Sequence, residues 1–174
     1  DPCALILGDN IFYGAGLTSH LNNSVNRAME GKATIYAYYV SNPSSFGIVE
    51  LDENNNALSI EEKPANPKSN YCVTGLYFYP AGVAQIAQTV EKSARGEYEI
   101  TTLNNIYLQN NNLHVTPLGR GYSWLDAGTH FSLTDASDYV RDLETHQGLK
   151  IACLEEIAYL NGWISKEDYA LEFF

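Results

Sequence analysis

Apolar positions near the start of the chain follow two different periods. Residues 3–8 (CALILG) form a continuous apolar run that ends at a turn, which predicts a buried strand of a parallel sheet with Asp9 at its C-terminal end. Residues 16–32 place apolar side chains on one helical face, and Gly31 suits the C-terminal cap. Residues 33–40 (ATIYAYYV) are rich in strand-forming side chains. A strand, a crossover helix and a strand in this order indicate parallel pairing with a right-handed connection.

The middle of the chain alternates strand, loop and helix patterns. Residues 46–63 are predicted to form a hairpin around the turn ENNN, and two prolines make residues 62–70 a loop. Further strands are expected at residues 71–80 and 113–119, and helices at residues 81–94 and 99–112.

The last third of the sequence is almost entirely helical in pattern. Residues 129–148 carry an apolar stripe at helical spacing, and SKED at residues 165–168 resembles a capping box that starts a short final helix. We therefore expect an α/β fold with a mixed sheet in residues 1–130 and a helical C-terminal extension in residues 131–174.

Charge and composition narrow the classes of function. A net charge of −11, with only ten Lys and Arg residues, argues against a general nucleic-acid-binding surface. No apolar run approaches the roughly 20 residues of a membrane helix, and no signal peptide is recognised. Three widely separated cysteines form no zinc spacing or disulfide framework, which favours reduced thiols in a cytoplasmic protein.

Two aspartates are candidate metal ligands. Asp9 follows the first predicted strand, and Asp126 precedes small residues in WLDAGTH, just before a helix. Ligands bind at the carboxyl edge of strands in open α/β sheets, and Mg²⁺ commonly uses one or two carboxylates there. Each aspartate could instead be a turn residue or a helix N-cap, and the sequence alone does not show that the two meet.

Two cations are candidate phosphate ligands. Lys63 follows Glu61 and Glu62 at the end of the predicted hairpin, where Pro64 makes a rigid corner. Arg95, one of four arginines, lies in the loop between two predicted helices. The alternative for both is an ordinary solvated surface charge.

Other common site patterns are missing from the sequence. The four histidines pair with no Ser or Cys nucleophile and show no metal-ligand spacing, and His20 is interpreted as structural. No Gly-rich loop follows the first predicted strand, although such a loop usually binds the phosphates of a nucleotide.

Five ordered motifs resemble the sugar-1-phosphate nucleotidyltransferases, from one end of the chain to the other. They are LILGDNIFYG, SFGIVELDENNNALSIEEKP, KSNYCVTGLYFYP, SARGEYEIT and GRGYSWLDAGTH. The likeness is greatest to members that make dTDP-glucose and pyrophosphate from glucose 1-phosphate and dTTP. It implies a partial Rossmann-like nucleotidyltransferase fold, a Mg²⁺ cofactor and a cytoplasmic homotetramer in the full-length protein.

The resemblance also assigns roles to individual residues. Asp9 and Asp126 would hold Mg²⁺, and Lys63 and Arg95 would bind the attacking sugar phosphate. The remaining substrate-binding residues implied by the family are Asn10, Phe46, Gly47, Glu62 and Val73.

The sequence departs from the family at three places. The Gly-Gly-x-Gly-Thr-Arg-Leu loop that binds the nucleotide is missing and is expected upstream of LILGDN, so we expect the 174-residue chain to be inactive alone. Phe46 stands where many relatives have tyrosine, and Leu160 stands where close relatives often carry arginine near a regulatory site. Two alternatives stay open: a non-catalytic module for sugar-phosphate binding or oligomerisation, and a uridylyltransferase of the same family.

Overall fold

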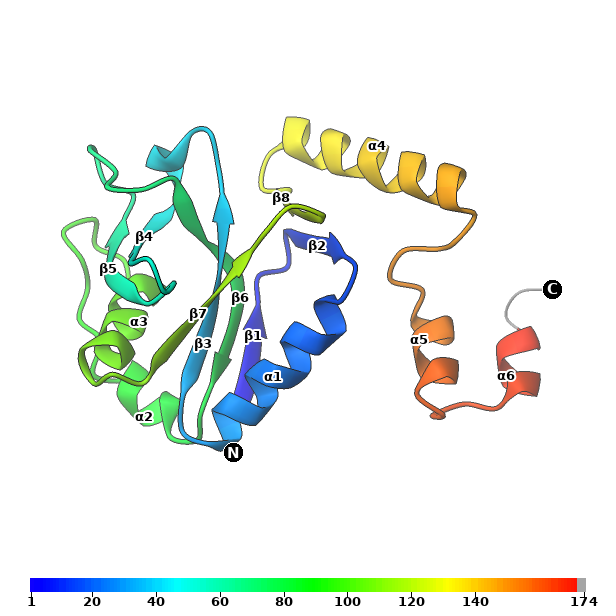
Figure 1. The fold of residues 1–174 in the computed structure, drawn as a ribbon, viewed down its shortest axis with the longest axis horizontal. Coiled ribbons are helices and arrows are strands. Elements are labelled where there is room, and N and C mark those ends of the chain that lie inside the picture. The colour runs from blue at the N-terminus through cyan, green and yellow to red at the C-terminus, as the bar shows by residue number, and fades with distance from the viewer. Residues whose placement is uncertain (172–174) are drawn as a thin grey trace. The chain divides into compact units, whose positions relative to one another are not determined.

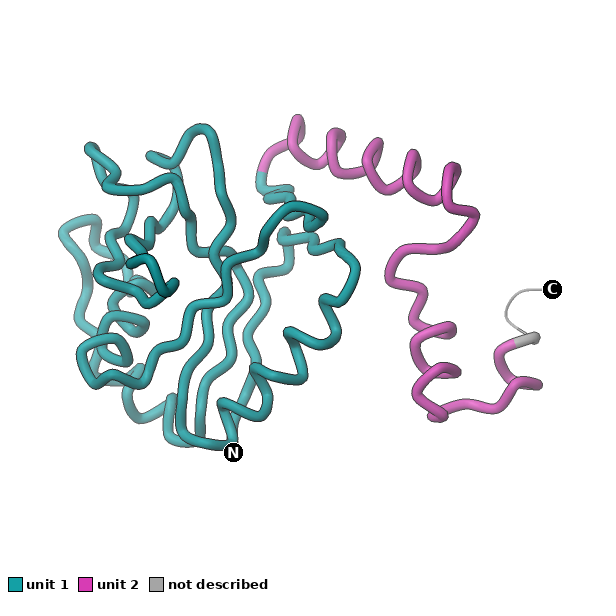
Figure 2. Tube along the Cα trace, in the orientation of Figure 1, with its two compact units in different colours: residues 1–128 teal, residues 129–174 magenta. Residues whose placement is uncertain are grey.

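The first unit of the protein is built around its longest strand, β6 (Tyr71–Tyr79). The structure is a computed structural model that describes residues 1–171, and the chain divides into two units, Asp1–Gly128 and Thr129–Phe174 (Figure 2). The other strands are β1 (Cys3–Ile6), β2 (Asn10–Gly14), β3 (Ala33–Tyr39), β4 (Gly47–Leu51), β5 (Ala57–Glu62), β7 (Leu113–Leu118) and β8 (Tyr122–Asp126). The first-unit helices are α1 (Leu17–Met29), a 3-10 turn (Pro43–Ser45), α2 (Val83–Ala87) and α3 (Ile100–Gln109) (Figure 1).

One edge of β6 is shared by two strands. Strand β3 runs antiparallel along one side of β6, and β7 is parallel to β3. On the other side, β1 pairs with Leu76–Tyr79, whereas β4 pairs at Cys72 and continues the sheet to β5. Strands β1 and β4 therefore diverge near Gly75, because one strand edge cannot hold both at the same position. Strands β2 and β8 form a separate two-stranded sheet.

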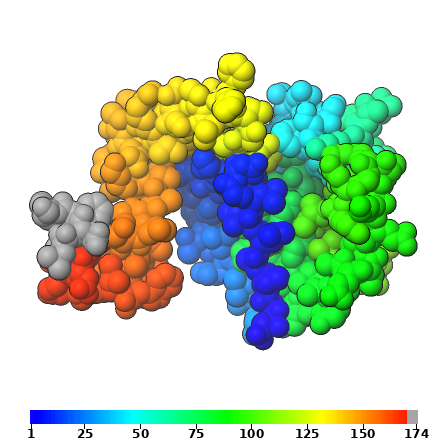
Figure 3. Space-filling view, turned by 180° about the vertical axis from the view of Figure 1, so that it is seen from behind, coloured from blue at the N-terminus to red at the C-terminus, as the bar shows by residue number. Residues whose placement is uncertain are grey.

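The predicted pairing of the first strand is wrong. Strand β1 is not hydrogen-bonded to β3, because β6 lies between them and is antiparallel to both. The chain direction of β1 and β3 is nevertheless the same, as expected. Strand β1 is also exposed rather than buried, with Ile6 57% exposed (Figure 3). Among the described residues, β1 has a sheet neighbour along one of its edges only. That neighbour, β6, lies about 70 residues later in the sequence, and a local apolar run does not reveal such a distant partner.

Side-chain alternation along β3 separates two hydrophobic clusters. Ala33, Ile35 and Ala37 belong to the cluster that includes residues of α2 and α3, whereas Tyr36 packs in the cluster that includes Ala28 of α1. Successive strand residues point to opposite faces, so α1 covers one face of the sheet and the α2–α3 segment covers the other (Figure 1).

Most other predicted elements are present in the first unit. The hairpin forms with Gly47 opposite Glu62, and α1, β3, β6, α3 and β7 lie where the sequence pattern placed them. Of the helix expected at residues 81–94, only α2 is present, and it ends at Ala87. The prediction is wrong for the residues that follow. Thr89 and Val90, both β-branched, follow in a turn in which the amide of Thr89 donates to Ile86 O. Strand β2 was not predicted.

The second unit consists of helices α4 (His130–Gln147), α5 (Leu154–Leu160) and α6 (Lys166–Leu171). Helix α4 begins with a reciprocal capping box between Thr129 and Ser132. The predicted box before α6 is confirmed, because Ser165 and Asp168 bond each other's backbone amides. No helix in the described part of the chain is long and apolar enough to cross a membrane. The resemblance also implies that residues 1–130 are the sugar-phosphate- and metal-binding part of a nucleotidyltransferase domain and that residues 131–174 are its helical extension, and this assignment stays a prediction.

Tyr79→Phe is expected to lower the free energy of unfolding by about 1–3 kcal/mol. The fully buried Tyr79 hydroxyl donates to Asn104 Oδ1 at 2.7 Å, and its loss leaves a buried acceptor without that donor. Urea unfolding followed by circular dichroism measures the change. Tyr39→Phe is the matched control, because Tyr39 is 62% exposed and its variant should stay within about 0.5 kcal/mol of the parent. Equal stability of the two variants would contradict the assigned bond.

Candidate active site

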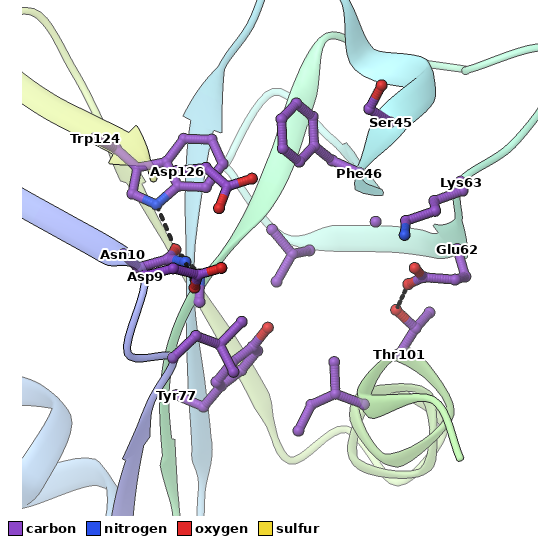
Figure 4. Close-up of a pocket in the computed structure, with 15 residues that line it drawn as sticks. Asp9, Asn10, Ser45, Phe46, Glu62, Lys63, Tyr77, Thr101, Trp124 and Asp126 are labelled. Atoms are coloured by element: carbon purple, nitrogen blue, oxygen red, sulfur yellow. Dashed lines mark hydrogen bonds between the residues drawn. The ribbon is translucent and has the colours of Figure 1, made fainter. Parts of the chain in front are cut away.

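A cavity of about 250 Å³ opens where β1 and β4 diverge along β6 (Figure 4). Every predicted site residue except Arg95 lines it. The lining residues are Leu7, Asp9, Asn10, Ser45, Phe46, Gly47, Glu62, Lys63, Val73, Gly75, Tyr77, Ile100, Thr101, Trp124 and Asp126. The motifs that were widely separated in the sequence therefore meet in one place.

Two carboxylates converge on one side of this cavity. Asn10 and Asp126 are opposite each other in the β2–β8 pair, and the amide of Ala127 donates to Asp9 O at 2.7 Å. A Cβ atom placed on Gly128 would lie 3.3 Å from Asp9 Oδ2 and 3.5 Å from Asp126 Oδ1. Glycine at this position therefore leaves room where both carboxylates point.

Burial raises the pKa of Asp126, and the nearby charge of Asp9 raises it further. Two like charges held this close repel, and a cation between them would relieve the repulsion. The described residues hold no group of three or more His, Cys, Asp or Glu side chains that could bind a metal ion by themselves. The carboxylate pair fits Mg²⁺, which needs only one or two protein carboxylates and takes its other ligands from water and substrate phosphates.

Asn10 fixes the position of the first carboxylate. Its Oδ1 accepts hydrogen bonds from Trp124 Nε1 at 2.6 Å and from the amide of Gly75 at 2.9 Å. The two donors leave the Asn10 amide group with one orientation, in which Nδ2 donates to Asp9 Oδ1 at 2.9 Å. Asn10 thus links β8, β6 and the metal-ligand candidate Asp9.

The opposite side of the cavity carries a cation and a third carboxylate. Thr101 donates to Glu62 Oε2 at 2.5 Å, and a Cβ on Gly47 would lie 3.2 Å from each of these oxygens. Lys63 has φ = 41°, a left-handed conformation that is unusual before proline. Its ammonium group points into the cavity (Figure 4). Strained backbone of this kind is retained mainly at functional positions.

Arg95 lies outside the residues that line the cavity. Its guanidinium pairs with Glu62 at 3.4 Å, with Glu97 at 2.8 Å and with Glu99 at 3.6 Å. It therefore contacts Oε1 of Glu62, while Thr101 binds Oε2. The predicted contact between Arg95 and a sugar phosphate stays a prediction.

Phe46 and Val73 contribute apolar surface to the cavity, and several further lining residues were not identified from the sequence. Phe46 packs edge-on against Trp124, with ring centroids 5.3 Å apart. Trp124, Thr101, Gly75 and Tyr77 had not been singled out. Trp124 could have been identified from the sequence, because it lies two residues before Asp126 in the motif GRGYSWLDAGTH. A buried indole N–H needs a hydrogen-bond acceptor, so Trp124 was a candidate to bind a side chain of the site.

Residues 1–142 match the family model described as "Nucleotidyl transferase". The chain belongs to this family. It is 54% identical over 167 residues to a glucose-1-phosphate thymidylyltransferase of Mycobacterium tuberculosis (strain ATCC 25618 / H37Rv). The alignment covers 96% of this chain and 57% of the relative. A protein of the same name from Neisseria meningitidis serogroup A is 52% identical, with the same coverage. The chain thus spans somewhat over half the length of these curated relatives.

Two solved structures have the same fold. A putative glucose-1-phosphate thymidylyltransferase from Bacillus anthracis, in complex with a sucrose, superposes with a TM-score of 0.71 at 37% identity. The alignment covers 82% of this chain and 55% of that one. A UDP-glucose pyrophosphorylase complexed with UDP-glucose gives a TM-score of 0.67 at 17% identity, with 82% and 57% coverage, and supports the fold alone. The predicted nucleotidyltransferase fold is confirmed.

Gly75→Ala is expected to destabilise the protein by about 1–3 kcal/mol. A Cβ at Gly75 would lie 2.6 Å from Asn10 Oδ1 and 2.8 Å from Leu7 Cδ1, so the link to Asp9 must shift. Gly8→Ala is the matched control, because no atom lies within 4 Å of the added carbon. Chemical unfolding compares the two, and an equal loss in both would contradict this account of the junction between β1 and β4.

Proposed function

We propose that the protein containing this chain transfers a thymidylyl group from dTTP to glucose 1-phosphate, giving dTDP-glucose and pyrophosphate. The observation that carries this proposal is the arrangement of the cavity, in which the Asp9 and Asp126 carboxylates lie across from Lys63 and Glu62. The 54% identity to a glucose-1-phosphate thymidylyltransferase supports the choice of nucleotide and sugar.

The reaction joins two anions, so charge and orientation decide its rate. An oxygen of the sugar phosphate attacks the α-phosphorus of dTTP, a new P–O bond forms, and the bond to pyrophosphate breaks in line. Lys63 would bind the attacking phosphate and reduce its repulsion from the triphosphate. No covalent intermediate with the protein is required, and positioning supplies much of the acceleration.

Asp9 and Asp126 would hold Mg²⁺ in this proposal. When bound, the ion supplies positive charge to phosphate oxygens and offsets the charge that develops during transfer. Asn10 would act through Asp9, because its amide is fixed by Trp124 and Gly75 and holds one oxygen of that carboxylate. Burial raises the pKa of Asp126, and a bound cation would favour its ionised form.

The glucose unit would lie between Glu62, Gly47, Val73 and Phe46. Glu62 can accept hydrogen bonds from sugar hydroxyls because Thr101 and Arg95 occupy only part of the acceptor capacity of its two oxygens. Gly47 allows close approach of the ligand to the backbone, and Phe46 with Trp124 supplies an apolar surface for a ring face. The predicted homotetramer and cytoplasmic location belong to the same proposal for the full-length protein.

Asp126→Asn and Asp9→Asn are each expected to reduce turnover at least about 100-fold at ordinary Mg²⁺ concentrations, because each removes one charge from the metal ligands. The assay follows pyrophosphate release from dTTP and glucose 1-phosphate, using the protein at the length of its relatives. Asp135→Asn, on the exposed surface of α4, is the control and should retain activity. Near-normal turnover with unchanged Mg²⁺ dependence in both site variants would refute the metal assignment. Absence of product with every sugar phosphate and dTTP would refute the function.

Lys63→Ala is expected to raise the KM for glucose 1-phosphate far more than the KM for dTTP. Loss of a hydrogen bond to a charged group costs about 1.5–3 kcal/mol, which is roughly 10- to 150-fold. Lys68→Ala removes a nearby lysine that pairs with Glu61 at 2.6 Å outside the cavity, and it should leave both constants near their parent values. Steady-state kinetics in which both substrates suffer equally would argue against the assigned role.

A further inference from the structure

A second cavity, of about 340 Å³, lies between α1, β7 and the turn that joins β4 to β5. Helix α1 contributes His20, Asn23 and Arg27, which share one face at spacings of three and four residues. Residues 114–117 of β7 and the three asparagines at residues 54–56 complete the lining. None of these residues lines the candidate active site, so the second cavity is separate from it in composition.

Positive charge gathers at this cavity in a chain that is otherwise strongly acidic. Burial lowers the pKa of His114, and the charges of Arg27 and Lys32 lower it further. The sequence has 21 Asp and Glu residues against ten Lys and Arg. Within residues 1–171, no carboxylate forms an ion pair with Arg27 or Lys32, although four other basic side chains do so elsewhere. Among the described residues, the cluster of Arg27, Lys32 and His114 therefore has no carboxylate partner that would neutralise its positive charge.

The acidic residues closest in sequence to the lining residues are Glu30, Asp52 and Glu53, and none of them lines the cavity. Asp52 does not line the cavity, and its carboxylate accepts hydrogen bonds from the amides of Asn54 and Asn56 and from the Asn56 side chain. These bonds lower the pKa of Asp52 and direct its oxygens to its own turn. The titratable residues that line the cavity are thus His20, Arg27 and His114, and Lys32, just beyond the helix, adds its charge near His114.

We propose that this second cavity binds a small phosphorylated molecule, with Arg27 and His114 contacting its phosphate. A guanidinium group offers paired donors that match two phosphate oxygens, and a protonated imidazole adds a further charge-assisted donor. Asn23 and the asparagines of the turn supply neutral donors and acceptors for the rest of the ligand. The cavity volume is within the range of small-molecule sites, and the like charges exclude a divalent cation as occupant.

His20 is held at the wall of the cavity by an edge-on contact with Tyr122, with centroids 5.6 Å apart. It is therefore available as a fixed probe beside the proposed phosphate. Because a bound dianion favours the charged form of His114, its binding should raise the pKa of that imidazole. By linkage, affinity should increase as pH falls through the pKa of His114.

Nuclear magnetic resonance of the histidine rings in the 174-residue chain tests the proposal directly. Inorganic phosphate and then pyrophosphate are titrated near pH 6 at constant ionic strength, with acetate as the comparison anion. The expected result is a saturable shift of the His114 and His20 signals with both phosphate probes and a much weaker response to acetate. A linear, non-saturating response, or acetate binding equal to phosphate, would overturn the proposal.

Variants locate the binding site and separate it from the active site. Arg27→Gln should weaken phosphate binding at least about tenfold, because it removes a charge-assisted contact. Arg141→Gln removes the same charge from an exposed residue of α4 and should leave binding unchanged. Equal weakening by the two variants would show general charge attraction and overturn the site. Asp126→Asn should leave the His114 response intact, and its loss there would assign pyrophosphate to the first cavity instead.

A second variant keeps the proposal testable if Arg27→Gln does not fold. His114→Gln should retain phosphate binding with reduced affinity, and the ratio of parent to variant affinity should be larger at pH 5.5 than at pH 8. Isothermal titration calorimetry measures this ratio, in which the protonation of phosphate itself cancels because parent and variant are compared at the same pH. An unchanged pH dependence of affinity in His114→Gln would contradict the assigned contact.

Discussion

The edge of strand β6 can hydrogen-bond only one strand at each position, and the site depends on this constraint. Strand β1 occupies the end of the edge at Leu76–Tyr79, and β4 occupies the other end at Cys72. Between them, the Gly75 carbonyl accepts from the amide of Leu7, and the Gly75 amide donates to the Asn10 side chain. A side chain thus satisfies a backbone group that a sheet partner would otherwise bind, and the two strands can separate around an open space.

The separation gives the cavity two chemically different sides. Asp9 lies in the turn between β1 and β2, and Asp126 is the last residue of β8. On the other side, Glu62 ends β5 and Lys63 follows it. An acidic side suits a metal ion, and a side with an ammonium group suits a phosphate. The strands that carry these side chains must therefore be correctly packed before the acidic side and the side with the ammonium group face each other.

Local sequence patterns predicted the elements better than their pairing. The hairpin of β4 and β5, helix α1 and the box at Ser165 follow from turn residues, periodicity and capping, which act over a few residues. The position of β6 between β1 and β3 depends on contacts between distant segments, so the expected β1–β3 pairing was wrong.

The site shows the same division between local and long-range information. Asp9 stood out because it follows a predicted strand, Lys63 because it precedes a proline, and Asp126 because it lies before small residues and a helix; all three line the cavity. The roles of Thr101 and Trp124 arise from partners 39 and 114 residues away, and no local pattern encodes these contacts. Arg95 also followed from the sequence as a charged loop residue, but its three carboxylate partners became evident only in the fold.

The bond between Trp124 and Asn10 also gives the protein an internal optical probe. The chain has two tryptophans, and the second, Trp163, is 74% exposed in the other unit. Trp124 is partly buried, and its indole nitrogen is bound within the carboxylate side of the cavity. Its emission therefore depends on an intact junction between β2, β6 and β8, whereas that of Trp163 reports the solvent. Once Trp163 is replaced by phenylalanine, the remaining tryptophan emission comes from Trp124 alone, and it is recorded with excitation that the 13 tyrosines do not absorb.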